Sequence, residues 1–360
     1  MVVGFLAAKK YLVLEDRTIF EGNSFGADVD CDGEVVFNTG MVGYPESLTD
    51  PSYEGQILCF TYPLIGNYGV PSDERDEFGL LKNFESEKIH ARGVIVHECC
   101  KRPSHWMSKK TLDEWMKENG VPGIEGIDTR ALTKKLRKRG VMLGAIKNEK
   151  SVDRFEDPNE KNLVAEVSTK EKLIGNGKRK KIAVIDCGVK NNILQNILKE
   201  FDVVLLPWDT PAKRILELDV NGLVISNGPG DPKMCKETIE TTKNLLGEIP
   251  MLGICLGNQI IALACGGDTY KLKYGHRGQN KPCVDLETKK CYVTSQNHGY
   301  AVDANSLPKN VKVWFVNADD KSVEGLVGPN FISVQFHPEA SPGPTDTEFV
   351  FKRFFEMVKK

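Results

Sequence analysis

The first half of the chain alternates apolar and polar positions over short segments. Alternation with a period of two is typical of half-buried strands, and it predicts strands at 11–14, 34–37, 56–61 and 92–97. Helical periodicity indicates helices at 112–119 and 129–139, with Asp128 placed to cap the second. The outward residues of that second helix are basic: Lys134, Lys135, Arg137, Lys138 and Arg139. A solvated face is the simpler interpretation of these cations, and docking onto a partner protein is the alternative.

Beyond residue 180 the pattern becomes a series of short, continuously apolar runs. They lie at 182–185, 203–206, 223–226, 251–254 and 332–336, and helical periods at 191–201 and 236–246 separate the earlier ones. Strands that are apolar on both faces and alternate with helices are typical of an open, mostly parallel sheet covered on both sides. We therefore predict an α/β protein, with this sheet in residues 180–360 and a smaller mixed α/β domain in residues 1–150.

A charged stretch separates these two regions. Residues 151–179 hold few large apolar side chains, and we interpret them as a charged linker between the two domains. The stretch runs into four successive cations: Lys178, Arg179, Lys180 and Lys181. A basic run can contact nucleic acid, but no aromatic residues are interleaved with this one, so a solvated linker end fits better.

Composition excludes several classes of protein. The 360 residues carry 48 Lys and Arg against 50 Asp and Glu, a balance that favours neither nucleic acid nor a membrane surface as partner. Ten cysteines without a Cys-x-x-Cys pair indicate reduced thiols rather than a disulfide framework or a metal site. Lysines follow the apolar run at 2–8 instead of preceding it, which argues against a signal peptide, and no later segment is long enough to span a bilayer. We expect a soluble, cytoplasmic protein.

One cysteine stands where a reactive thiol is expected. The segment Gly253-Ile254-Cys255-Leu256-Gly257 follows an apolar strand and precedes a helical segment. Its small residues permit the sharp strand-to-helix turn of a nucleophile elbow, and a helix beginning directly after Cys255 favours the reactive thiolate. Because small residues around a buried cysteine are also common, a structural cysteine remains the alternative until a base and an oxyanion site are found.

A histidine that could activate Cys255 follows the last apolar run. His337 is the one histidine of six that follows a strand of the second domain and has a carboxylate two residues on, Glu339. In extended backbone these two side chains would share a face, so Glu339 could fix the tautomer of the imidazole, and Pro338 would stiffen the segment. His298 is the competing base, but we expect it to lack a nearby carboxylate.

An oxyanion site is the third requirement for attack on a carbonyl carbon. The backbone N–H of Leu256 lies next to the nucleophile, and the Gly-rich loop at 226–231 directly follows a strand. Pro229 has no N–H, so Gly228 or Gly230 would supply the second donor. An ordinary loop is the alternative; phosphate binding fits less well because the loop lacks the Lys-Ser/Thr ending of a P-loop.

These motifs together resemble the class I, triad-type glutamine amidotransferases. The segments 253–259 and 336–339 look like the nucleophile and base motifs of that family, and the likeness extends over 180–360. It implies that Cys255 releases ammonia from glutamine through a glutamyl thioester, with His337 as the base and Glu339 orienting it.

The first domain is similar to the N-terminal domain of the carbamoyl phosphate synthetase small chain. The segments 38–44, 48–53, 61–69 and 122–130 carry this likeness, together with 188–190. It implies that glutamine is bound by Ser52, Gly228, Gly230, Leu256, Gln259, Asn297, Gly299 and Tyr300. It also implies a large synthetase subunit that receives the ammonia and uses bicarbonate, ATP and Mg to make carbamoyl phosphate for arginine and pyrimidine synthesis. This chain, which has no nucleotide motif, would need no cofactor of its own.

Two departures from the family pattern and two other functions remain to be weighed. Asn258 stands where many relatives have histidine and Tyr300 where many have phenylalanine, so we expect altered tuning rather than lost activity. A non-catalytic, glutamine-binding regulatory subunit is disfavoured by the intact Cys-His-Glu set. A free-standing cysteine hydrolase is disfavoured by the specific first domain.

The initial Met and the Lys-rich end lead us to expect a free subunit rather than part of a fused polypeptide.

Overall fold

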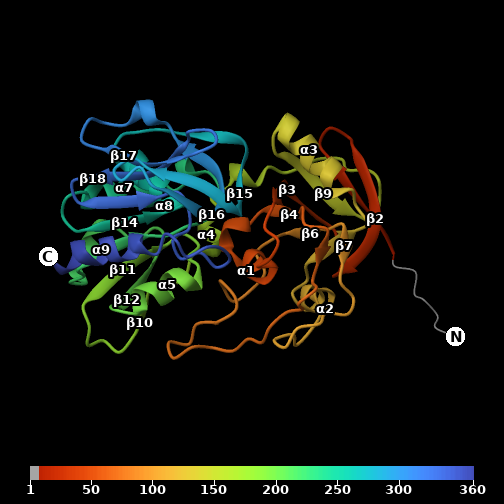
Figure 1. The fold of residues 1–360 in the computed structure, drawn as a ribbon, viewed down its shortest axis with the longest axis horizontal. Coiled ribbons are helices and arrows are strands. Elements are labelled where there is room, and N and C mark those ends of the chain that lie inside the picture. Colours follow the sequence, from red (N-terminus) through yellow and green to blue (C-terminus); the bar gives the residue numbers. More distant parts are fainter. Residues whose placement is uncertain (1–7) are drawn as a thin grey trace.

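The computed structural model describes residues 8–360, which form two domains side by side along the long axis of the molecule (Figure 1). The apolar run at 2–8 therefore lies, apart from Ala8, outside the described residues. Among the helices that the structure describes, none combines the length and the apolar character needed to cross a bilayer.

The first domain is built around a closed barrel. Its strands neighbour one another in the order β1 (Lys9–Leu14), β2 (Ile19–Gly26), β8 (Pro122–Glu125), β6 (Gly93–Ile95), β4 (Gln56–Phe60), β3 (Cys31–Asn38) and β9 (Met142–Lys147). The predicted strands correspond to β1, β3, β4 and β6, whereas β2, β8 and β9 give no clear signal in the pattern. Successive residues of β3 lie on opposite faces, so Val35 and Val36 enter two different apolar clusters.

Three helices and a strand pair complete the first domain. They are α1 (Tyr44–Thr49), α2 (Leu112–Glu118), α3 (Thr129–Arg139) and the pair of β5 (Leu64–Ile65) with β7 (Glu98–Cys99). The predicted cap is confirmed, because the Asp128 carboxylate accepts a hydrogen bond of 2.9 Å from the N–H of Ala131. Part of the basic face of α3 is used within the chain: Lys135 lies 2.6 Å and Arg139 3.3 Å from the Asp16 carboxylate. Two of the five cations are therefore paired within the chain, and both interpretations of the face stay predictions.

The second domain contains one large twisted sheet. Its parallel centre has the order β12 (Asp202–Pro207), β11 (Lys181–Asp186), β13 (Gly222–Ile225), β14 (Met251–Ile254) and β19 (Phe331–Val334). Antiparallel strands extend it at both edges: β10 (Lys172–Ile174) on one side, and β18 (Val323–Gly328), β17 (Lys312–Asn317), β15 (Thr269–Asp285) and β16 (Cys291–Val302) on the other. The predicted apolar runs all lie in the parallel centre.

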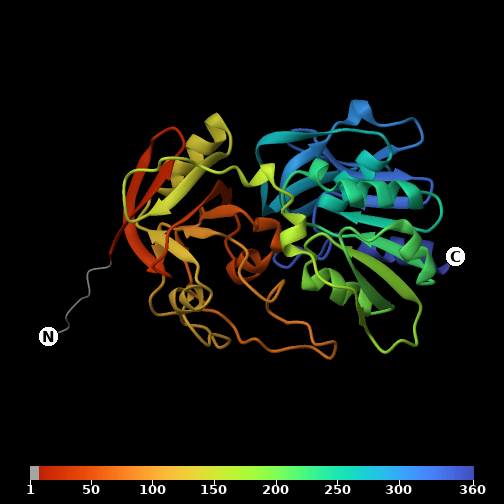
Figure 2. The same cartoon turned by 180° about the vertical axis from the view of Figure 1, so that it is seen from behind.

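Helices cover both faces of this sheet, as predicted (Figure 2). One apolar cluster joins the sheet to α5 (Asn191–Leu198) and α9 (Phe349–Lys359). The other joins it to α6 (Ala212–Glu217), α7 (Lys236–Leu245) and α8 (Leu256–Ala264). Burial on both faces explains why the central strands are continuously apolar.

The stretch at 151–179 connects the two domains and also contributes regular structure and buried side chains of its own. It contains α4 (Val164–Val167) and β10, and it buries Leu163, Val164 and Ile174. Its basic end is also engaged, because the Arg179 backbone N–H and Nε both donate to the buried Asp202 carboxylate. These few buried apolar residues reach a core although Leu173 beside them stays exposed, and a count of charges does not detect them.

Candidate active site

Cys255 lies on the tight turn between β14 and α8. Its backbone has φ 55° and ψ −101°, a combination that L-residues rarely adopt, and its N–H donates to the Val334 carbonyl at 2.8 Å. Neighbouring glycines permit the turn: a Cβ on Gly257 would lie 2.0 Å from the Ile225 carbonyl oxygen. This is the strained strand-to-helix geometry of a nucleophile elbow.

His337 and Glu339 lie together in the same domain, both buried. The Nδ1 of His337 is 2.7 Å from Oε1 of Glu339. The backbone between them is a turn rather than the extended segment we expected, because the N–H of Ala340 donates to the carbonyl of His337. Lys190 holds the other side of the carboxylate, with its Nζ 3.0 Å from the same Oε1 and 2.8 Å from the Ala340 carbonyl. The pair is therefore positioned by a third residue, which the sequence placed in a family-like segment but gave no role.

Electrostatics keep this pair charged despite its burial. Burial alone would lower the pKa of His337, but the Glu339 carboxylate and the facing Cys255 thiol raise it to about 10. Burial would likewise raise the pKa of Glu339, but Lys190 and His337 lower it to about 2. The Nε2 of His337 has no other hydrogen-bond partner among residues 8–360, which leaves it available to the thiol or a substrate.

A pocket opens directly above the thiol. Every residue expected to bind glutamine lines it alongside Cys255: Ser52, Gly228, Gly230, Leu256, Gln259, Asn297, Gly299 and Tyr300. The sequence did not indicate several other lining residues, among them Glu34, Gln56, Asn159, Lys271 and Arg277. Three of these come from the first domain and the connecting stretch, where no local motif points to the pocket.

The residues expected to supply oxyanion donors, Leu256, Gly228 and Gly230, all line the pocket. Leu256 is the first residue of α8, so its N–H has no acceptor within that helix. Gly230 has φ +83°, and a Cβ on Gly228 would lie 2.1 Å from the Cys187 carbonyl oxygen. Only glycine therefore lets this loop approach so closely. The geometry leaves both glycines as candidates for the second donor.

The first domain contributes Ser52 to the lining of the pocket and supports that lining through Asp50. One Asp50 carboxylate oxygen accepts from Nδ2 of Asn297 at 2.9 Å, and the other accepts from Nδ2 of Asn227 at 3.3 Å. Asn227 also donates to Oγ of Ser52 at 3.0 Å. Asp50 fixes both amides although it does not line the pocket, so a search for lining chemistry would not have found it.

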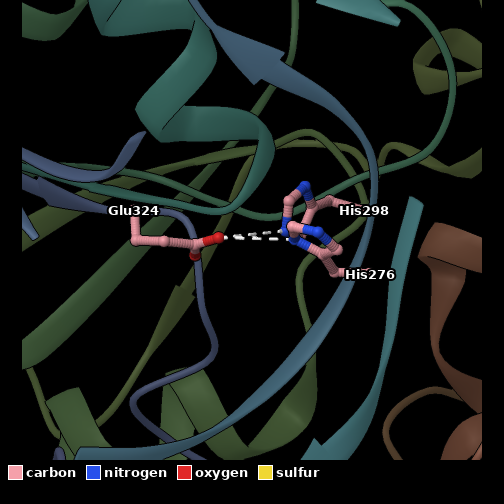
Figure 3. Close-up of side chains that lie close together, drawn as sticks. All are labelled: His276, His298 and Glu324. Carbon is pink, nitrogen blue, oxygen red and sulfur yellow. Dashed lines mark ion pairs between the residues drawn. The ribbon is translucent and has the colours of Figure 1, made fainter. Parts of the chain in front are cut away.

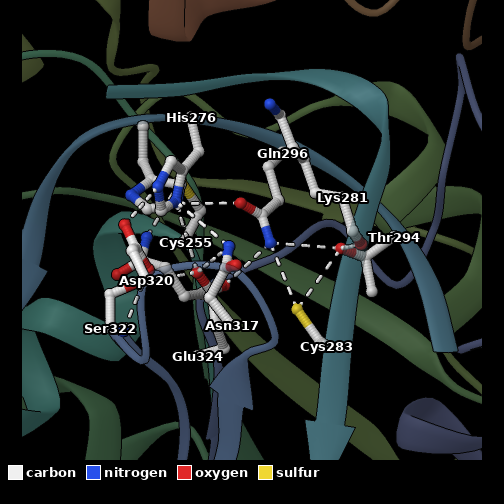
Figure 4. Close-up of polar contacts among 12 residues, drawn as sticks. Cys255, His276, Lys281, Cys283, Thr294, Gln296, Asn317, Asp320, Ser322 and Glu324 are labelled. Atoms are coloured by element: carbon white, nitrogen blue, oxygen red, sulfur yellow. Dashed lines mark hydrogen bonds and ion pairs between the residues drawn. The ribbon is translucent and has the colours of Figure 1, made fainter. Parts of the chain in front are cut away.

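A buried polar cluster adjoins the pocket, formed by His276, His298 and Glu324, of which His298 also lines the pocket (Figure 3). Within residues 8–360 this is the one group of donors close enough to hold a metal ion. Protein partners already engage its outer atoms: His298 Nδ1 meets the Tyr300 carbonyl at 2.8 Å, and His276 Nε2 meets Asp320 at 2.9 Å. Asn317 and Gln296 donate to Glu324, so a wider hydrogen-bond network surrounds the three residues (Figure 4).

This cluster corrects one expectation about His298. Its Nε2 lies 3.8 Å from Glu324, so His298 does have a carboxylate nearby, contributed by a strand distant in the sequence. Burial and the neighbouring His276 hold the pKa of His298 well below its usual range. Cys255 raises the pKa of His337 and not that of His298, so His337 is the candidate base that interacts with the thiol.

The two departures from the family pattern lie in different places. Asn258 is fully buried, donates to Oε1 of Gln335 at 3.2 Å and accepts from Oγ of Ser333 at 2.8 Å. Gln335 in turn places its Nε2 3.7 Å from the Cys255 sulfur. Tyr300 lines the pocket itself, and its carbonyl accepts from Gln259 at 2.9 Å. Asn258 can thus affect the thiol only indirectly.

Comparison with known proteins defines first the class and then the family. Residues 183–357 match the family model described as glutamine amidotransferase class-I, in agreement with the sheet and the Cys255 turn. Residues 12–146 match the model for the carbamoyl-phosphate synthase small chain, CPSase domain. The chain belongs to the carbamoyl phosphate synthase small chain family.

Named relatives align with nearly the whole chain. A carbamoyl phosphate synthase small chain from Archaeoglobus fulgidus is 47% identical, with 98% of this chain and 99% of the relative aligned. An arginine-specific small chain from Neurospora crassa is 47% identical over 98% of this chain and 80% of its own length. The multifunctional protein CAD from Squalus acanthias is 49% identical, and this chain spans only 16% of it. A solved glutamine amidotransferase from Thermotoga maritima aligns with 51% of this chain and 84% of its own at a TM-score of 0.38 and 21% identity, which adds nothing to the assignment.

Proposed function

We propose that this chain is the glutamine-hydrolysing component of a glutamine-dependent carbamoyl phosphate synthase. One observation carries the proposal: Cys255 stands on a strained turn facing His337, which bonds Glu339, under a pocket lined by all the residues expected to bind glutamine. That arrangement provides a nucleophile, an acid–base group with its orienting carboxylate, and backbone donors for an oxyanion.

The chemistry follows from these positions. The Cys255 thiolate attacks the carboxamide carbon of glutamine, and the N–H of Leu256 with that of Gly228 or Gly230 stabilises the charge that develops on oxygen. Protonated His337 donates its proton to the amide nitrogen, which leaves as ammonia and gives a glutamyl thioester. Neutral His337 then takes a proton from water as the water attacks the thioester, and glutamate departs with the thiolate restored.

The ammonia would pass to a large synthetase subunit or domain. That partner would bind ATP and Mg and use bicarbonate to form carbamoyl phosphate for arginine or pyrimidine synthesis. Transfer away from bulk water would keep the ammonia unprotonated and nucleophilic. The free thiols among the described residues suit a reducing compartment, and we propose the cytoplasm.

The test is ammonia release from glutamine by the wild type and by Cys255→Ala, with and without the large subunit. We expect turnover by the wild type, acceleration by the partner, and none above background for the variant. Glutamine binding without turnover by the wild-type complex would instead identify a regulatory subunit. Full activity that the partner does not change would identify a free-standing hydrolase.

A further inference from the structure

Glu85 belongs to the first domain but is fully buried against the second. It lies in the long segment between β5 and β6, and its side chain is 0% exposed. One carboxylate oxygen accepts from Nδ2 of Asn192 at 2.7 Å and from the hydroxyl of Ser341. The other accepts from the backbone N–H of Asn192 at 3.2 Å. Burying a carboxyl group this completely costs free energy, which these hydrogen bonds must offset.

Glu85 caps a helix of the other domain by accepting hydrogen bonds from backbone N–H groups. Helix α5 begins at Asn191, and the preceding residue, Lys190, makes no side-chain cap. The N–H of Asn191 instead donates to the Glu85 carbonyl at 2.8 Å, and the N–H of Asn192 donates to the Glu85 carboxylate. The first two N–H groups of α5 therefore take their acceptors from the first domain.

The hydrogen bond from Ser341 connects Glu85 to the segment that carries His337. Ser341 comes two residues after Glu339, and its hydroxyl donates to Glu85 while accepting from Nδ2 of Asn192 at 2.9 Å. Lys190, directly before α5, holds Glu339 and the Ala340 carbonyl. Glu85 thus binds both segments that fix the Glu339 carboxylate, one through the start of α5 and one through Ser341.

We infer that Glu85 is a positioning residue for the glutaminase reaction, acting through Lys190 and Ser341 on Glu339 and so on the orientation of His337. This inference rests on the proposed function, and it gives the first domain a role in the reaction besides lining the pocket. Glu85 is not among the residues that line the pocket. Its loss should therefore slow the chemical step and leave substrate binding nearly unchanged.

The experiment compares Glu85→Gln with Glu87→Gln in the full chain bound to its large subunit. Glu87 lies on the same segment but is exposed and pairs with Arg75, so its variant controls for charge removal. We expect Glu85→Gln to lower kcat about tenfold and to move the glutamine KM by less than about twofold, because a small misplacement of a catalytic pair slows the step strongly. Alkylation of Cys255 by iodoacetamide, followed on its own peptide by mass spectrometry, should slow by a similar factor.

Ser341→Ala gives a second, milder test if Glu85→Gln folds poorly. It removes one of the two connections and should lower kcat less, and the double variant should lose less than the product of the two single effects. A lower Tm with unchanged kcat and unchanged alkylation of the folded protein would reduce Glu85 to a structural residue and overturn the inference. If the wild type itself hydrolyses no glutamine, the proposed function fails, while the alkylation rates still decide the role of Glu85.

Discussion

At the residue scale, the buried Glu339 carboxylate favours the protonated form of His337. The Glu339 carboxylate is the larger of the two charges that raise the pKa of His337 to about 10. In Glu339→Gln the pKa of His337 should fall, because the charge is lost while the shape is kept. We expect kcat/KM to drop about a hundredfold and its alkaline limb to move to lower pH.

The control for this change is Glu356→Gln, on the exposed side of α9. Its pH profile should superimpose on that of the wild type. An unchanged alkaline limb in Glu339→Gln would show that the carboxylate does not set the protonation of His337.

The same raised pKa makes the stability of the protein depend on pH. His337 binds its proton more tightly when folded than at its ordinary pKa of 6.5, so its stabilising effect is complete below pH 6.5. That effect should be lost as pH rises from 6.5 towards 10. The free energy of unfolding, measured with urea, should therefore fall more over this range for the wild type than for His337→Gln, whose side chain does not titrate there. Parallel curves for the two proteins would contradict this assignment.

Single residues also show how far a sequence can reveal a site. Cys255, His337 and Glu339 could be selected because their side chains carry recognisable chemistry at strand ends. Asp50, Lys190 and Glu85 could not, because each acts through partners in the other domain or in a distant loop. Their importance follows from contacts that exist only after folding, such as the 3.0 Å bond from Lys190 to Glu339.

At the element scale, the contact of α8 with β13 depends on Gly257. A Cβ there would lie 2.0 Å from the backbone oxygen of Ile225, which cannot move aside as a flexible side chain can. Gly257→Ala should therefore lower the free energy of unfolding by about 2 kcal/mol or more and displace the Cys255 turn. Urea denaturation and ammonia release both measure the effect.

Gly247→Ala separates this clash from ordinary glycine strain. Gly247 has φ +88° but open space around its Cβ position, so its variant should cost only about 1 kcal/mol and leave activity unchanged. Equal losses in the two variants would mean that close packing of α8 is not what Gly257 provides.

The sequence patterns missed one strand of the second domain, β15, for an identifiable physical reason. The central strands of the second domain are apolar on both faces, and their pattern is plain. β15 contains Lys271, Arg277 and Gln279, which face the first domain: Lys271 lies 2.6 Å from Glu34, and Gln279 donates to the Val42 carbonyl. A strand that pairs with another domain through polar groups has no apolar period to detect.

At the scale of the whole molecule, the pocket exists only where the two domains meet. Asp50 connects them by accepting hydrogen bonds from Asn227 and Asn297 of the second domain. In Asp50→Ala both amides lose a charged acceptor, and Asn297 lines the pocket. We expect the glutamine KM to rise about tenfold, because a hydrogen bond to a charged group contributes on the order of 1.5–3 kcal/mol. Asp32→Ala, on the exposed part of the same barrel, should leave KM unchanged. A normal KM in Asp50→Ala would mean that the second domain forms its binding site without this connection, and that the first domain contributes to catalysis by other contacts.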